Sequence, residues 1–319
     1  MNPSGTSTSA AISPTPVLAQ VQPAAVTAAP RPSPWLLGLK LDLLLFIATP
    51  VLVLPLALGV QKLYGSAVVG ALAGLGALGH HMPGMMRAYG DRELFSRFKV
   101  RFVVAPLFLL AACVTCAVLD PKMGGLVMLT YMWGVWHAFM QIHGFLRIYD
   151  GRVKSFARVT ALLDQWMCIT WFVGGALSSD WWVHLIVSAF YVGGGPMLQL
   201  GYLDTIRMVW FGLMGLVTAA YFVNLVVCAR AGRPQSPVKL LLLATSIPFW
   251  WYANAVVENP LVGVLLFEFF HDVQYLSIVW MFNRRRVAND AQIGSFTAYL
   301  FRNRGALIGL YVLLVMAYG

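Results

Sequence analysis

Long apolar segments recur along the chain, and short groups of polar residues separate them. Most of these segments have about 18 residues or more, enough for a helix to cross about 30 Å of hydrocarbon. Strands of a membrane barrel would alternate apolar and polar residues, and these segments do not. Because lipid cannot satisfy an open backbone, the pattern predicts an all-α, polytopic transmembrane helical bundle of about eight or nine spans. We expect the spans at residues 42–61, 66–86, 102–119, 124–146, 160–178, 206–229, 238–257, 261–283 and 305–318.

Two parts of the chain depart from this pattern. Residues 1–34 are rich in Ala, Pro, Ser and Thr, with Arg31 as the only charged side chain. This composition predicts a disordered cytoplasmic tail, without a cleaved signal peptide, before a single membrane domain at residues 35–319. Residues 181–203 begin as an apolar segment but are interrupted by Gly193-Gly194-Gly195-Pro196, which favours a re-entrant or interfacial piece over a full span.

Composition supports the membrane class and the distribution of charge predicts an orientation. The chain is 59% hydrophobic and 11% charged, whereas soluble domains contain about 25% charged residues. Its net charge of +10 comes largely from basic residues in alternate loops, at 87–101, 147–158 and 284–304. The positive-inside rule then places these loops and the N-terminus in the cytoplasm, which predicts a multi-pass protein of a cell inner membrane. We therefore expect the bilayer, and no nucleic acid, as the partner; a homo-oligomer is compatible with the sequence.

Five of the six histidines lie in or beside three predicted spans. His80 and His81 are near the end of the second span, His137 and His143 lie in the fourth, and His271 lies in the eighth. Ionisable residues inside a span are costly to bury, and they are candidates for function for that reason.

The eighth predicted span also contains a polar stripe. Glu268, His271, Asp272 and Tyr275 are related by steps of three and four residues, so they share one side of a helix. Such a stripe is expensive against lipid and is therefore expected to face the interior of the bundle.

These residues predict a metal ion, and iron is favoured because histidines with a carboxylate and open positions suit non-haem iron and oxygen chemistry. The expected ligands are His80, His81, His137 and His271. The expected partners in catalysis and in hydrogen bonding to cofactor, water or substrate are Glu268, Asp272, Gln141, Tyr275, His143 and Gln274. The predicted activity is a membrane metal-dependent oxidoreductase or oxygenase acting on a lipophilic substrate such as a lipid, isoprenoid or quinone.

Three alternatives remain open at this stage. Histidines from two facing helices would be the axial ligands of a b-type haem. Carboxylates of the eighth span would relay protons in a transporter, although the chain lacks the internal repeat typical of one. The polar residues would only cross-link helices in a structural or assembly subunit.

Depth along the helices limits whether the histidines can meet. At about 1.5 Å per residue, His80 and His81 lie about 9–11 Å above Arg87, His137 about 15 Å above Arg147, and His271 about 20 Å above Arg284. A common site then requires the eighth helix to be tilted or broken near Asn259-Pro260. Arg147 itself is expected to be a headgroup anchor, and Cys113 and Cys116, despite their CxxC spacing, are expected to be small packing residues.

Three strings stand out in the sequence: His80-His81-x-Pro83-Gly84-x-x-Arg87, His137-x-x-x-Gln141-x-x-Gly144-x-x-Arg147-x-Tyr149-Asp150 and His271-x-x-Gln274-Tyr275. Together they resemble a set of uncharacterised polytopic bacterial membrane proteins, over most of residues 35–286. The resemblance implies the architecture and the candidate residues but no activity, because none is assigned to that set. The distribution of histidines is also similar to that in Brp/Blh carotene-cleaving dioxygenases and membrane desaturases, which implies iron, but HxxxH and HxxHH boxes are absent.

Overall fold

The structure is a computed structural model that describes residues 33–120, 122–233, 235–289, 295–302 and 306–319. These residues form helices and no strand, which confirms the all-α class. The predicted tail lies almost wholly outside the described residues.

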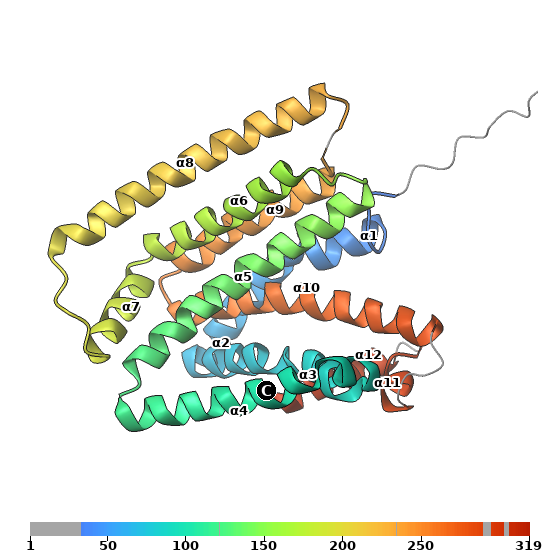
Figure 1. Cartoon of the computed structure of the whole chain (residues 1–319), viewed down its shortest axis with the longest axis horizontal. Coiled ribbons are helices and arrows are strands. Elements are labelled where there is room, and N and C mark those ends of the chain that lie inside the picture. Colours follow the sequence, from blue (N-terminus) through green and yellow to red (C-terminus); the bar gives the residue numbers. More distant parts are fainter. Residues whose placement is uncertain (1–32, 121, 234, 290–294, 303–305) are drawn as a thin grey trace, which may run out of the picture. The chain divides into compact units, whose positions relative to one another are not determined.

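Figure 1 shows the helices in chain order, several of them lying side by side as long rods. Short π-helical turns, η1 and η2, lie next to α1 and α9. The elements are α1 (Leu39–Asp42), η1 (Leu43–Ile47), α2 (Thr49–Gly79), α3 (Met82–Gly90), α4 (Arg92–Leu119), α5 (Gly124–Arg152), α6 (Arg158–Ser178), α7 (Asp180–Val192), α8 (Leu200–Arg230), α9 (Pro237–Trp251), η2 (Tyr252–Val256), α10 (Pro260–Asn289), α11 (Ser295–Leu300) and α12 (Ala306–Tyr318).

The helix α2 is two helices joined at Gly65. This residue has φ 78° and ψ 179°, a backbone conformation that glycine adopts without the clash a Cβ would cause. The predicted spans 42–61 and 66–86 lie on either side of it, and Figure 1 shows the chain turning back at this point. The second half ends at Gly79, and α3 begins two residues after His80 with Pro83 in its first turn.

Four helices are long and apolar enough to cross a membrane: Thr49–Gly90, Arg92–Leu119, Gly201–Arg230 and Pro260–Asn289. This finding supports the membrane class. By contrast, α7 has only 13 residues, about 20 Å of helix, and it ends where the Gly193-Gly194-Gly195-Pro196 segment begins.

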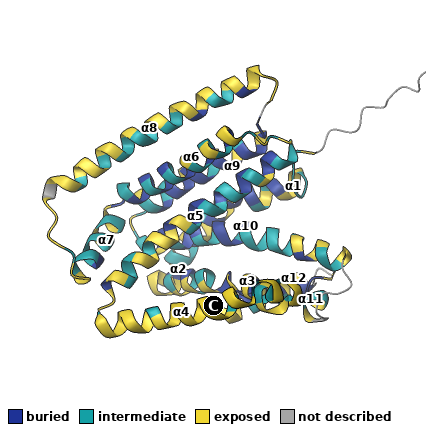
Figure 2. Ribbon diagram, in the orientation of Figure 1, coloured by how far each residue is buried: buried dark blue, intermediate teal, exposed yellow. Residues whose placement is uncertain are grey.

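The buried core lies where α5, α6, α9 and α10 pack together, and it is rich in aromatic rings. Phe172 of α6 stacks on Trp250 of α9, with ring centroids 4.9 Å apart. In contrast, α4 has no buried residue, as Figure 2 shows by its almost continuous yellow and teal colour. The interior of the bundle is therefore defined by α2, α5, α6, α9 and α10.

Candidate metal centre

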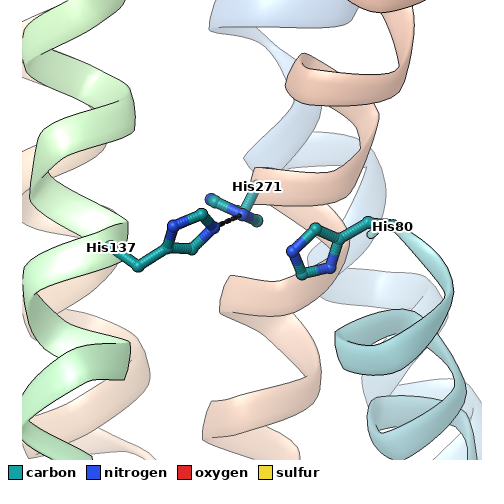
Figure 3. A group of neighbouring side chains, drawn as sticks. All are labelled: His80, His137 and His271. Carbon is teal, nitrogen blue, oxygen red and sulfur yellow. Dashed lines mark hydrogen bonds between the residues drawn. The ribbon is translucent and has the colours of Figure 1, made fainter. Parts of the chain in front are cut away.

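Three histidines from three helices meet inside the bundle. His80 follows the last turn of α2, His137 lies in the middle of α5, and His271 lies in the middle of α10. Figure 3 shows the three rings turned toward one shared space. The Nε2 atoms of His137 and His271 are 3.1 Å apart, and one ring nitrogen from each histidine lies within 4.8 Å of the others. The predicted convergence of these imidazoles is therefore present in the structure.

The contacts of His80 define which of its nitrogens is free. Its Nδ1 lies 3.0 Å from the Gly76 carbonyl oxygen and 3.0 Å from Asp272 Oδ1, and both of these are acceptors. We therefore assign the ring proton to Nδ1, which leaves a lone pair on Nε2. This Nε2 is buried and has no hydrogen-bond partner among the described residues. A histidine oriented in this way by a carboxylate and a carbonyl is the usual arrangement of a metal ligand.

Gly76 makes room for this arrangement. A Cβ placed on Gly76 would lie 2.7 Å from Asp272 Oδ2, closer than real Cβ contacts allow. The missing side chain therefore lets the carboxylate of α10 approach the last turn of α2. Gly74, two residues earlier, has nothing within 4 Å of such a Cβ.

Two carboxylates border the same histidine. Ligand atoms of His80, Glu268 and Asp272 lie within 4.8 Å of one another. Glu268 Oε2 is buried and has no hydrogen-bond partner among the described residues, and the buried Asp272 Oδ1 meets only the Nδ1 of His80 there. In the part of the chain that the structure describes, no lysine or arginine forms an ion pair with either carboxylate. The histidines and these two residues form what we call the histidine–carboxylate centre: His80, His137, His271, Glu268 and Asp272.

The two predicted amides hold helices together around this centre. Gln141 Nε2 donates to the His271 carbonyl oxygen at 2.9 Å, which connects α5 to α10. Gln274 is fully buried, and its Nε2 donates to the Phe46 carbonyl oxygen of η1 at 2.8 Å. Both amides therefore position the backbone of α10 beside the imidazoles.

The remaining predicted residues lie at different distances from the centre. The ring of Tyr275 is 5.9 Å from that of His80, centroid to centroid. The ring of His81 is tilted against that of His80 at a centroid distance of 4.2 Å, but His81 is exposed and is in neither group of ligand atoms within 4.8 Å. His143 is also in neither group, although its Nδ1 is buried without a partner.

A second polar cluster, not expected from the sequence, lies near the ends of α5, α6 and α9. Lys239 is fully buried, and its Nζ donates to Asp150 Oδ2 at 2.9 Å and to Asp164 Oδ2 at 3.0 Å. Arg147 forms ion pairs with the same two carboxylates. The expectation that Arg147 is a headgroup anchor missed these contacts, because its guanidinium is paired with two carboxylates of the protein. We call Arg147, Asp150, Asp164 and Lys239 the charged cluster.

Comparison of the chain with models of protein families, with curated proteins and with solved structures finds no match. The fold and the site define a helical membrane protein with a buried set of imidazoles and carboxylates that could hold a metal ion.

Proposed function

We propose that this protein is an integral membrane oxidoreductase that depends on a metal ion, with iron as the favoured metal, and that acts on a lipophilic substrate. The observation behind the proposal is the set of buried acceptors in the histidine–carboxylate centre that have few donors. Among the described residues, His80 Nε2 and Glu268 Oε2 have no hydrogen-bond partner, and Asp272 Oδ1 meets only the Nδ1 of His80, at 3.0 Å. A cation is the species that satisfies several such lone pairs at once.

Charge supports the same conclusion. Two ionised carboxylates in an apolar bundle, with no lysine or arginine paired to them, would each cost several kcal/mol. One divalent cation held by the three imidazoles would neutralise both. The charged cluster, in contrast, already contains equal numbers of positive and negative side chains.

The separation of the imidazoles fits a shared metal ion. The Nε2 atoms of His137 and His271 are 3.1 Å apart, close enough to hydrogen-bond to each other, and both would be within reach of one metal ion. Three histidines and one carboxylate would hold the ion and leave positions open for oxygen or substrate. A b-type haem is less compatible, because its axial imidazoles lie on opposite faces of a wide macrocycle.

We further propose that the chain crosses a bacterial inner membrane about nine times, with its N-terminus in the cytoplasm. The helices before and after Gly65, together with α5, α6 and α9 extended by η2, overlap predicted spans in residue range, which supports this number. The histidine–carboxylate centre then lies near the middle of the bilayer. His137 is close to the midpoint of the 29-residue α5, and His271 is close to the midpoint of the 30-residue α10. A lipophilic substrate is the natural one at this depth.

Metal analysis of the detergent-purified protein tests the proposal. We expect about one iron per chain, a change in its absorption spectrum on reduction, and loss of the metal in His271→Ala. The matched control is His184→Ala, because His184 is an exposed histidine on α7 outside the centre. Protein without a stoichiometric metal, or with a redox-inactive metal only, would contradict the proposed activity.

A further inference from the structure

One side of the histidine–carboxylate centre is closed by protein, and the other is not. His80, His271 and Asp272 are buried, and Gly79 beside them packs so tightly on α12 that a Cβ there would lie 2.5 Å from the Val315 carbonyl oxygen. On the other side, His137 is half-buried and His81 is exposed. The ring of His81 is 4.2 Å from that of His80 and 6.1 Å from that of His137. Access to the centre is therefore from the side of His81.

This open side is at the depth of the hydrocarbon. The helical segment from Gly65 to Gly90 is about 37 Å long, and His81 lies within about 5 Å of its middle. An exposed imidazole at that depth is expensive if it faces acyl chains alone. Its nitrogen atoms need a partner that brings a hydrogen-bonding group into the apolar layer.

The helix α4 packs on α3, which begins directly after His81, and its hydrogen bonds to the rest of the protein lie toward its ends. Tyr89 donates to the Phe102 carbonyl oxygen at 2.9 Å near the start of α4, and the Gly125 amide is 3.4 Å from Asp120 Oδ2 beyond its end. Between these points none of the residues of α4 is buried. The apolar surface of α4 is thus continuous with the bilayer and leaves the side of His81 accessible to it.

Aromatic residues border the same side. Trp133 precedes His137 by four residues and so lies one turn away on the same face of α5. It pairs with Trp136 at a centroid distance of 4.7 Å, and both indoles are exposed. Flat indole and imidazole surfaces favour a flat, unsaturated ring as the ligand.

We propose that the side of His81 binds the ring of an isoprenoid quinone or quinol, with a ring oxygen hydrogen-bonded to His81, the ring beside Trp133 and Trp136, and the isoprenoid tail in the bilayer along α4. This inference rests on the proposed function and specifies its substrate class. A neutral head is required, because the nearest basic side chain along the chain, Arg87, is six residues or about 9 Å further on and lies over the Phe282 ring at 4.7 Å. An anionic lipid head at the depth of His81 would therefore lie about one and a half helical turns from Arg87.

Equilibrium binding of decylubiquinone to the metal-loaded protein, followed by quenching of tryptophan fluorescence, tests this inference. We expect saturable binding that is at least tenfold weaker in His81→Leu and unchanged in His184→Leu, the matched exposed histidine. Decanoate, which has an anionic head, should not compete. Trp136→Phe should reduce the quenching more than Trp181→Phe, because Trp181 lies on α7. The metal content of every variant is measured in parallel.

The outcomes separate the two proposals. Metal-loaded protein that binds decylubiquinone equally well in His81→Leu, or that binds decanoate competitively, contradicts the quinone site and leaves the metal centre in place. Loss of the metal in His81→Leu would make His81 a ligand and also contradict its assigned role. Wild-type protein without metal would contradict both proposals.

Discussion

The molecule contains two buried polar clusters that differ in one respect. In the charged cluster, two cations face two carboxylates, and Lys239 donates to both of them from a fully buried position. In the histidine–carboxylate centre, two carboxylates have no lysine or arginine partner among the described residues, and His80 Nε2 is buried there without a hydrogen-bond partner. The charges of the charged cluster balance as folded, whereas the two carboxylates of the centre have no lysine or arginine paired to them in the part of the chain that the structure describes.

The difference indicates different roles for the two clusters. A charge-balanced network of buried side chains fixes how helices pack, and each member depends on the others. Buried carboxylates without a basic partner cost free energy that a bound cation recovers, as is typical of functional sites. Variants of Lys239 and of Gly76 test this distinction.

The largest effect is expected in the charged cluster. Lys239→Met leaves Asp150 and Asp164 with Arg147 as their only paired cation, so we expect a loss of about 3–5 kcal/mol of unfolding free energy. Unfolding of the detergent-solubilised protein measures it, with the exposed Lys62→Met as the control.

A double variant checks the cause of that loss. Lys239→Met combined with Asp164→Asn removes one charge of each sign and leaves the Arg147–Asp150 pair. Stability should then recover in part, since the uncompensated carboxylate is gone. If the single variant is as stable as the wild type, the cluster does not hold the helices together as we describe.

The residues of the centre could be predicted from the sequence because they are rare in apolar segments. Residue type and helical spacing predict all five of them: His80, His137, Glu268, His271 and Asp272. The sequence does not predict that the three histidines meet. Their depths in the membrane, measured from Arg87, Arg147 and Arg284, differ from one another. The basic side chains are imperfect markers of depth: Arg147 is paired inward, and α10 continues as a helix beyond Arg284.

The charged cluster was missed for a related physical reason. Lys239 is in the first turn of α9, where a sequence pattern cannot distinguish a buried lysine from one that reaches the headgroups. Its partners come from α5 and α6, and pairs of residues 89 and 75 positions apart are set by helix packing alone. The sequence offers one signal of the charged cluster: Lys239 falls just inside the predicted span 238–257.

A smaller effect is expected from moving a carboxylate of the centre without replacing any proposed ligand. Gly76→Ala places a Cβ 2.7 Å from Asp272 Oδ2, so the carboxylate has to shift away from His80 Nδ1. Loss of such an orienting partner typically weakens metal binding about 10–100-fold. Titration of the metal-free protein measures the affinity, and Gly74→Ala is the matched control, because its Cβ has open space. Equal affinities in the two variants would mean that Asp272 does not orient the proposed ligand His80.

The smallest effect is expected at an ion pair outside both clusters, between the loop residue Asp91 and Arg286 at 2.8 Å. Burial opposes ionisation of Asp91, but the Leu94 amide and the Arg286 guanidinium favour its charged form more strongly and hold its pKa below its usual range. A carboxyl with a lowered folded-state pKa stabilises the protein above its unfolded-state pKa of about 4, and this stability is lost as the pH falls through the folded-state value. Asp91→Asn keeps a side chain that can cap α4 and removes only the charge, so we expect it to cost less than about 1 kcal/mol at pH 7. The difference from the wild type should shrink as the pH falls below about 4 and as salt is added, whereas a constant difference would mean that the contact acts through packing and not through charge.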